Sequence, residues 1–244
     1  MAPTKPVALE AYERLAEAYA AKIDRKAHNA FYERPATLSL LPDVAGLDVL
    51  DAGCGPGAYS EWLVRRGARV VALDASPRMI EFARARAGSS VEYHVADLEG
   101  DLSFLPDAKF DLVLAPLVMD YIADWPPLLG KFHRTLKPSG LFVFSMGHPA
   151  FEAEYYNTKR YFEVERVKAV WKGFGPVVEM TSFRRSLSIA LNSLVTSGFD
   201  LVEVLEPLPT EEFKLSEPVK YERLLLRPAF LCIQARKRPV TRQR

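Results

Sequence analysis

Short apolar runs alternate with amphipathic segments along the first third of the chain. Residues 47–51 are an apolar run that ends in an acid and opens into a glycine-rich turn, which is typical of a buried parallel strand. A helical segment follows at residues 58–66, and a second apolar run ends at residue 74. A Ser-Pro pair opens the next helix, over residues 76–88, because proline is favoured at the first helical position. These segments predict one complete strand–helix–strand unit.

The same rhythm continues through the middle of the chain. Residues 91–97 alternate into a strand that ends in an acid, residues 110–115 read as a buried strand, and residues 128–136 supply a helical segment. Residues 141–146 are continuously apolar, as expected for a strand that helices cover on both faces. Alternating strands and helices of this kind predict an α/β fold with a doubly wound parallel sheet.

Two regions depart from this rhythm. Apolar positions at helical spacing over residues 9–23 predict a helix inside an N-terminal helical cap, residues 1–45, and a linker with two prolines leads from that helix to the first strand. Residues 148–182 carry many aromatic side chains among charged ones, and we expect them to form a cap insertion over the site. The remaining elements are a helix at residues 186–197 and strands at residues 199–205 and 228–236.

Length, charge and cysteine content narrow the setting. A chain of 244 residues is long enough for one substantial α/β domain, so we expect residues 1–244 to form a single domain. With 32 basic and 31 acidic residues the net charge is +1, which disfavours nucleic acid and anionic membranes as partners. Two cysteines, no signal-like start and no membrane-spanning run predict a cytoplasmic protein. The sequence leaves open whether it is a monomer or a homodimer. The basic end at residues 236–244 is interpreted as a solvated tail.

The turn Gly-Cys-Gly-Pro-Gly at residues 53–57 indicates a nucleotide-like cofactor, because glycine lets backbone approach a ligand. The turn also fits the G-x-G-x-x-A pattern of dinucleotide-binding proteins. Three features favour S-adenosylmethionine (SAM) over NAD, namely the third glycine, Asp51 before the turn and Asp97 at the end of the third strand. A carboxylate suits the ammonium group of SAM and would repel a pyrophosphate. An NAD-dependent oxidoreductase and a non-catalytic SAM-binding protein remain alternatives.

Five segments in this order and spacing resemble the class I SAM-dependent methyltransferases, in particular the bacterial small-molecule group similar to type 11 and ubiquinone-biosynthesis methyltransferases. The segments are residues 49–57, 73–77, 96–98, 110–113 and 133–141. The resemblance implies a seven-stranded sheet in the order 3-2-1-4-5-7-6, with the last-added strand antiparallel. It also implies methyl transfer from SAM, with S-adenosylhomocysteine as product.

The resemblance further implies a set of cofactor contacts. Gly53, Gly55 and Gly57 would lie beside the methionine part, Asp51 near its amino group, Asp74 on the ribose hydroxyls, Asp97 at the adenine amino group and Leu98 beside the base. The remaining expected contacts are Cys54, Ala75, Met79, Ala96, Ala115 and Tyr19. Tyr12, Tyr19 and Tyr32 would close over the sulfonium, which suits aromatic faces, with core packing as the default alternative for each of them. The structural alternative is that each glycine serves its turn and each acid caps the next helix.

The acceptor side is predicted from fewer signals. Asp120 stands where a frequent family form has histidine, and it would serve as a base if an apolar cap raised its pKa, with a helix-start or solvent-facing acid as the equal alternative. His148, at the carboxyl edge of the fifth strand, is a second candidate base, with a structural histidine as the equal alternative. Tyr121 and Arg184 are the expected substrate contacts; Arg184 would hold a carboxylate or phosphate, or else an ion pair with the insertion.

The remaining expectations concern metal and acceptor. The other histidines lack paired ligand spacing, so we expect no metal site. The aromatic-rich insertion and the balanced charge favour a small, partly apolar methyl acceptor. Sequence alone leaves open which atom of that acceptor is methylated.

Overall fold

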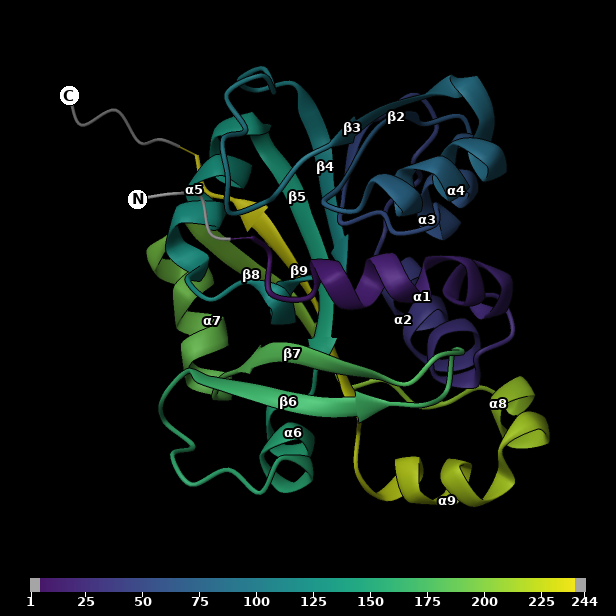
Figure 1. Ribbon diagram of the computed structural model, residues 1–244. Coiled ribbons are helices and arrows are strands. Elements are labelled where there is room, and N and C mark those ends of the chain that lie inside the picture. The colour runs from purple at the N-terminus through teal and green to yellow at the C-terminus, as the bar shows by residue number, and fades with distance from the viewer. Residues whose placement is uncertain (1–4, 240–244) are drawn as a thin grey trace.

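The computed structural model describes residues 5–239, and its centre is a seven-stranded sheet (Figure 1). The strand order is β3-β2-β1-β4-β5-β9-β8, and β9 alone runs antiparallel to its neighbours within this sheet. The strands are β1 (Asp48–Ala52), β2 (Arg69–Asp74), β3 (Val91–Val95), β4 (Phe110–Pro116), β5 (Leu136–Gly147), β8 (Phe199–Leu205) and β9 (Phe230–Lys237). The predicted order and the single antiparallel strand are confirmed.

Helices cover both faces of this sheet (Figure 1). One face carries α3 (Ala58–Val64) and α4 (Pro77–Ala87), and the other carries α5 (Trp125–Thr135) and α7 (Leu187–Thr196). Strand β5 supplies both cores, because successive side chains of a strand point to opposite faces. Phe142 and Phe144 join the core beneath α5 and α7, whereas Val143 joins the core beneath α3 and α4. This double burial explains why residues 141–146 are continuously apolar.

A cap covers the carboxyl edge of the sheet. It consists of α1 (Leu9–Lys22), a π-helical turn (Asn29–Glu33), α6 (Pro149–Tyr155) and a hairpin of β6 (Glu165–Trp171) and β7 (Val178–Arg184), whereas α2 (Arg34–Ser39) packs on the sheet face in the same core as α3 and α4. Figure 1 shows the hairpin running across the molecule beside α1, and Leu15 of α1 packs in one cluster with Met180 of β7. The expected proline linker is wrong at Pro35, which lies in the first turn of α2.

Helix α1 is also fastened to the sheet side of the molecule. Glu13 accepts a hydrogen bond from the Ser76 hydroxyl at the start of α4, and the backbone oxygen of Glu13 accepts one from Arg78 NH1 at 3.0 Å. Two further helices, α8 (Glu211–Ser216) and α9 (Pro218–Leu226), join β8 to β9 and were not predicted. The expectations about the start of the chain and the basic tail fall partly outside the described residues, at 1–4 and 240–244.

Candidate functional site

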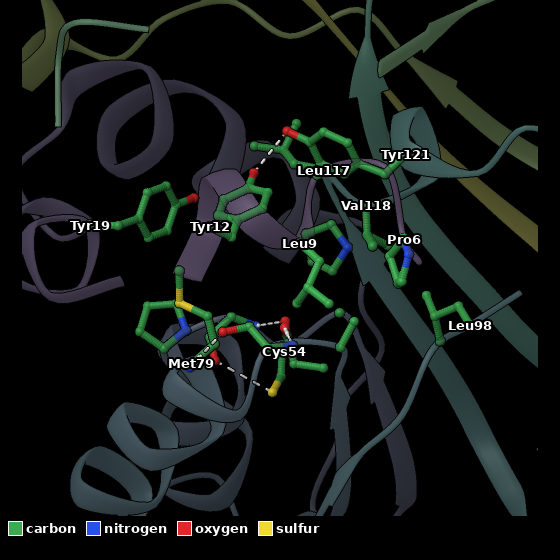
Figure 2. Close-up of a pocket in the computed structure, with 18 of the residues that line it drawn as sticks. Pro6, Leu9, Tyr12, Tyr19, Cys54, Met79, Leu98, Leu117, Val118 and Tyr121 are labelled. Atoms are coloured by element: carbon green, nitrogen blue, oxygen red, sulfur yellow. Dashed lines mark hydrogen bonds between the residues drawn. The ribbon is translucent and has the colours of Figure 1, made fainter. Parts of the chain in front are cut away.

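A cavity lies between α1 and the ends of β1, β2 and β4 (Figure 2). In Figure 2, Leu9, Tyr12 and Tyr19 of α1 face Cys54 and Met79 across it. The cofactor residues expected from sequence that line this cavity are Tyr19, Gly53, Cys54, Gly55, Asp74, Ala75, Met79, Ala96, Asp97 and Leu98. Asp51, Gly57 and Ala115 are not part of its wall. Tyr12 lines the cavity, whereas Tyr32 is fully buried and accepts a hydrogen bond from the Ala229 amide at 3.0 Å, so its expected place over the cofactor is wrong.

The glycines of the turn serve different purposes. Gly53, Gly55 and Gly57 all have a positive φ, at 77°, 52° and 82°. A Cβ on Gly53 would lie 2.5 Å from Cγ2 of Val118, so the β4 loop closes against it. A Cβ on Gly55 would meet nothing within 4 Å, although this residue lines the cavity. Gly55 is therefore the place where a ligand can approach the backbone directly, as the fit of a cofactor requires.

Gly57 holds two helices together, and its replacement by alanine should destabilise the fold. A Cβ there would lie 2.9 Å from the Ala83 Cα of α4, and φ is unfavourable for alanine. We expect a loss of about 1–3 kcal/mol in the free energy of unfolding, measured in urea. Gly46→Ala is the matched control, because φ is 73° and a Cβ would meet nothing within 4 Å. Equal losses in the two variants would contradict the close packing argument.

Two acids at strand ends contribute acceptors to the cavity. The Asp74 carboxylate accepts hydrogen bonds from the Gly55 amide at 2.8 Å and the Ser76 amide at 2.9 Å. Burial raises the Asp74 pKa to about 6 despite these bonds. Asp97 Oδ1 accepts a hydrogen bond from the Glu99 amide at 3.0 Å. Each carboxylate oxygen has a second lone pair, so both side chains can still accept hydroxyl or amino donors from a ligand.

Asp51 lies behind the turn in a fully buried position. Its Oδ2 accepts a hydrogen bond from the Ser60 hydroxyl at 2.6 Å, while Oδ1 has no partner among the described residues. Burial raises the Asp51 pKa to about 7. The unpartnered oxygen adds negative potential beneath the glycine turn, which suits a cationic group better than a phosphate.

The N-terminal segment contributes cavity residues that sequence reasoning missed. Glu33 lines the cavity, and its Oε1 accepts hydrogen bonds from the hydroxyls of Thr37 at 2.8 Å, Tyr59 at 2.8 Å and Ser145 at 2.5 Å. Arg34 lies beside it in the wall. The partners of Glu33 come from three separate elements, so no local sequence signal could have identified it.

A second cavity of about 440 Å³ adjoins the first. The two share Tyr12, Tyr19, Asn29, Leu117 and Tyr121 in their walls. The Tyr12 and Tyr121 hydroxyls are 2.8 Å apart at this boundary (Figure 2). Aromatic side chains, mostly from the insertion, line the rest of it: Phe151, Tyr155, Tyr156, Trp171, Phe174 and Phe230. A molecule in one cavity would thus be separated from a molecule in the other only by this partition of shared side chains.

Two carboxyl groups meet at the wall of the second cavity. Asp120 Oδ2 accepts a hydrogen bond from the Gly147 amide at 2.9 Å, and a Cβ on Gly147 would collide with Glu152 Oε1. Asp120 Oδ1 and Glu152 Oε2 have no partner among the described residues. Burial raises the Glu152 pKa to about 9, helped by the Asp120 charge, and burial raises the Asp120 pKa to about 6. Carboxyls this close hold one proton between them over a wide pH range.

His148 is held by hydrogen bonds at both ring nitrogens. Its Nδ1 accepts a hydrogen bond from the Ala150 amide at 3.2 Å, which caps α6. Its Nε2 lies 2.7 Å from Glu206 Oε1, so that nitrogen carries the hydrogen and donates a hydrogen bond to Glu206. The ring is part of neither cavity wall, so this geometry fits the structural alternative for His148 and does not bring it to the expected acceptor.

Arg184 likewise does not contact either cavity. It is fully buried, and its NH2 donates to the backbone oxygens of Arg160 at 3.2 Å, Tyr161 at 2.9 Å and Glu163 at 2.7 Å. Its Nε lies 3.1 Å from Glu165 Oε2. The predicted acceptor contact is therefore corrected to the alternative, an ion pair that holds the insertion. Tyr121, the other expected contact, does line both cavities.

Searches of residues 5–239 give two negative findings. No group of three or more histidine, cysteine, aspartate or glutamate side chains is placed to hold a metal ion. Within the same residues, every helix is too short or too polar to cross a membrane.

Comparisons with known proteins match this chain to methyltransferases. Residues 50–144 match the family described as a methyltransferase domain. A SAM-dependent methyltransferase from Mesorhizobium loti, of known crystal structure, is 30% identical, with a TM-score of 0.70; the match covers 88% of this chain and 100% of that one. An uncharacterized protein of Haemophilus influenzae is 28% identical over 232 residues, which is 86% of this chain and 88% of the relative.

A named curated relative matches over a shorter stretch. The malonyl-[acyl-carrier protein] O-methyltransferase of Pectobacterium atrosepticum is 38% identical over 112 residues, or 44% of this chain. The matched part is 42% of that relative's own length. This likeness therefore concerns the shared central part of the two chains.

Proposed function

The chain belongs to the class I SAM-dependent methyltransferases, and we propose that its methyl acceptor is a small, partly apolar molecule held in the second cavity. The cofactor is SAM, and the product is S-adenosylhomocysteine. The observation that carries the proposal is the shared wall of Tyr12, Tyr19, Leu117 and Tyr121 between the two cavities. A methyl group at this partition would face a cavity whose lining is largely aromatic.

The chemistry requires alignment above all. SAM supplies a methyl carbon bonded to a positively charged sulfur, which an acceptor atom displaces in line. The protein's part is to hold both molecules and to exclude water, and orientation of this kind is worth about 7–11 kcal/mol. Helix α1 covers the first cavity, and the hairpin and α6 enclose the second. The aromatic faces of Tyr12 and Tyr19 suit a sulfonium cation.

We assign Asp74 to the ribose hydroxyls, and Asp74→Ala tests this role. The variant should bind S-adenosylhomocysteine about 10- to 100-fold more weakly in calorimetry, because charge-assisted hydrogen bonds contribute about 1.5–3 kcal/mol. Asp101→Ala is the control, since Asp101 lies outside both cavity walls and accepts its hydrogen bonds from Ser103. Unchanged affinity in Asp74→Ala, with a folded protein, would refute the assignment.

The alternatives weighed on the sequence have less support. An NAD-dependent oxidoreductase would need a pyrophosphate beside the buried Asp51, and the relatives are named as methyltransferases. A non-catalytic SAM-binding protein would not need the second cavity. The unpaired thiols of Cys54 and Cys232 support a further proposal, that the protein works in the reducing cytoplasm.

A further inference from the structure

We infer that the acceptor has a proton-bearing group at one end, an anionic group at the other, and an aromatic or apolar body between them. The inference rests on the proposed function, because it takes the second cavity as the acceptor site. It follows from the way in which charge is distributed along that cavity.

The acidic end is the pair Asp120 and Glu152. Glu152 is 8% exposed and lines the cavity wall, and its buried Oε2 has no hydrogen-bond partner among the described residues. Asp120 Oδ1 is unpartnered in the same way. Arg185 is the nearest compensating charge: its NH2 donates to the Ile122 backbone oxygen at 2.6 Å, its guanidinium stacks 4.0 Å from the Trp125 ring centroid, and its Nε and NH1 have no hydrogen-bond partner among the described residues. Because the pair holds one proton between its two carboxyls, at least one of these buried oxygens is an acceptor without a donor, which a hydroxyl or amino group of a ligand supplies.

The basic end is formed by three lysines that line the same cavity: Lys26, Lys172 and Lys220. Lys26 Nζ lies 5.2 Å from the Phe174 ring centroid and against Gly173 in the hairpin turn. Lys220 is 3.0 Å from Glu217, which offsets part of its charge. Lys26 and Lys172 form no ion pair with any residue in the range 5–239. A negative group on a ligand would therefore be stabilised there.

The length of hairpin strand β7 gives the distance between the acidic end and the basic end of the second cavity. Ser182 of β7 and Tyr156 line the cavity together. Tyr156 lies four residues after Glu152, at the acidic end. Val178 pairs with Trp171 at the other end of the strand, where the turn with Lys172 begins. Four residues of strand span about 13 Å. Met180 lines the cavity between these ends and Trp171 lines it at the basic end, so the body of the acceptor would pack on apolar and aromatic side chains.

The placement of the acid pair next to the partition gives it a chemical role. In the sequence, Asp120 stands between Leu117 and Tyr121, and these two residues line both cavities. As the acceptor's heteroatom forms its bond to the methyl carbon, the carbon–sulfur bond breaks and its electron pair stays on the sulfur of S-adenosylhomocysteine. The proton of the acceptor group passes to the ionised carboxylate of the pair. Atoms and charge balance without any further reactant.

Binding of four matched probes to the protein saturated with S-adenosylhomocysteine tests the inference. The probes are 3-(4-hydroxyphenyl)propanoate, 3-phenylpropanoate without the hydroxyl, 4-propylphenol without the carboxylate, and tyramine with an ammonium in its place. Calorimetry should rank the first probe tightest and tyramine weakest. Tyramine binding as tightly as the hydroxylated acid would overturn the anionic end, and equal binding of the two propanoates would overturn the proton-bearing end.

Variants assign the ends to residues. Lys26→Met should weaken the hydroxylated propanoate about tenfold or more, whereas Lys22→Met, an equal charge change at an exposed residue outside both cavities, should not. Glu152→Gln should weaken the hydroxylated propanoate but leave 3-phenylpropanoate unchanged. Equal affinities in the two lysine variants would refute the basic end. Failure to bind S-adenosylhomocysteine would instead refute the proposed function, so the two failures are distinguishable.

Discussion

Replacing Glu152 with glutamine is expected to make the protein more stable at alkaline pH. Burial holds the Glu152 pKa far above its unfolded value, to about 9, so the folded state binds a proton that the unfolded state has lost. The stability that this proton confers is complete below pH 4.5 and is lost as pH rises toward the folded pKa, at about 1.4 kcal/mol per pH unit. Glutamine cannot ionise, so the variant should gain at least about 1.4 kcal/mol over the natural protein at pH 8.

Urea unfolding at pH 5 and pH 8 measures this effect. Glu154→Gln is the matched control, because Glu154 is an exposed acid on the same helix, α6. The control should leave the pH dependence of the natural protein intact. If Glu152→Gln and the natural protein lose stability in parallel between pH 5 and pH 8, Glu152 is not the group that holds the proton.

Replacing Arg184 with methionine should cost about 3–5 kcal/mol in the free energy of unfolding, because it leaves a carboxylate and buried backbone oxygens without their donor. Arg184 joins β7 to residues 160–163 and to Glu165 of β6. The 156–164 connection should therefore become the first site of protease cleavage. Limited proteolysis together with urea unfolding gives both readouts.

Arg166→Met is the control for this variant, since Arg166 is exposed on the neighbouring strand of the same hairpin. It should change stability by less than about 0.5 kcal/mol. If Arg184→Met were as stable as the control and had lost affinity for the hydroxylated propanoate, the acceptor contact predicted from sequence would be restored.

The sheet and the cofactor cavity were predictable because their signals are local. Strands β1, β2 and β4 are short apolar runs, β3 alternates, and an acid or glycine marks the place where β1 and β2 end. Gly53 and Gly55 have the positive φ that their spacing suggested. Met79, an expected cofactor contact, lines the cavity at the start of α4, where the Ser76 hydroxyl accepts a hydrogen bond from the Met79 amide at 3.1 Å.

The acceptor side was less predictable because its signals are tertiary. Strand β6 alternates between exposed and partly buried positions, but its partly buried side includes Glu165 and its exposed side includes Val170, so the residue types do not show the alternation. The role of His148 depends on Glu206, a residue 58 positions away along the chain. Glu152 looked like one of many acids in a charged segment until Gly147 and Asp120 placed it in the cavity wall. In each case the deciding contact comes from a part of the chain that local patterns do not connect.

Helix α1 walls both cavities with one face, since Tyr12 and Tyr19 belong to each lining. Its bonds through Glu13 to Ser76 and Arg78 fasten it to α4, next to the cofactor residues. Lifting α1 would therefore open both cavities to water at the same time. A ligand that held α1 down in one cavity would also keep the other cavity closed to water.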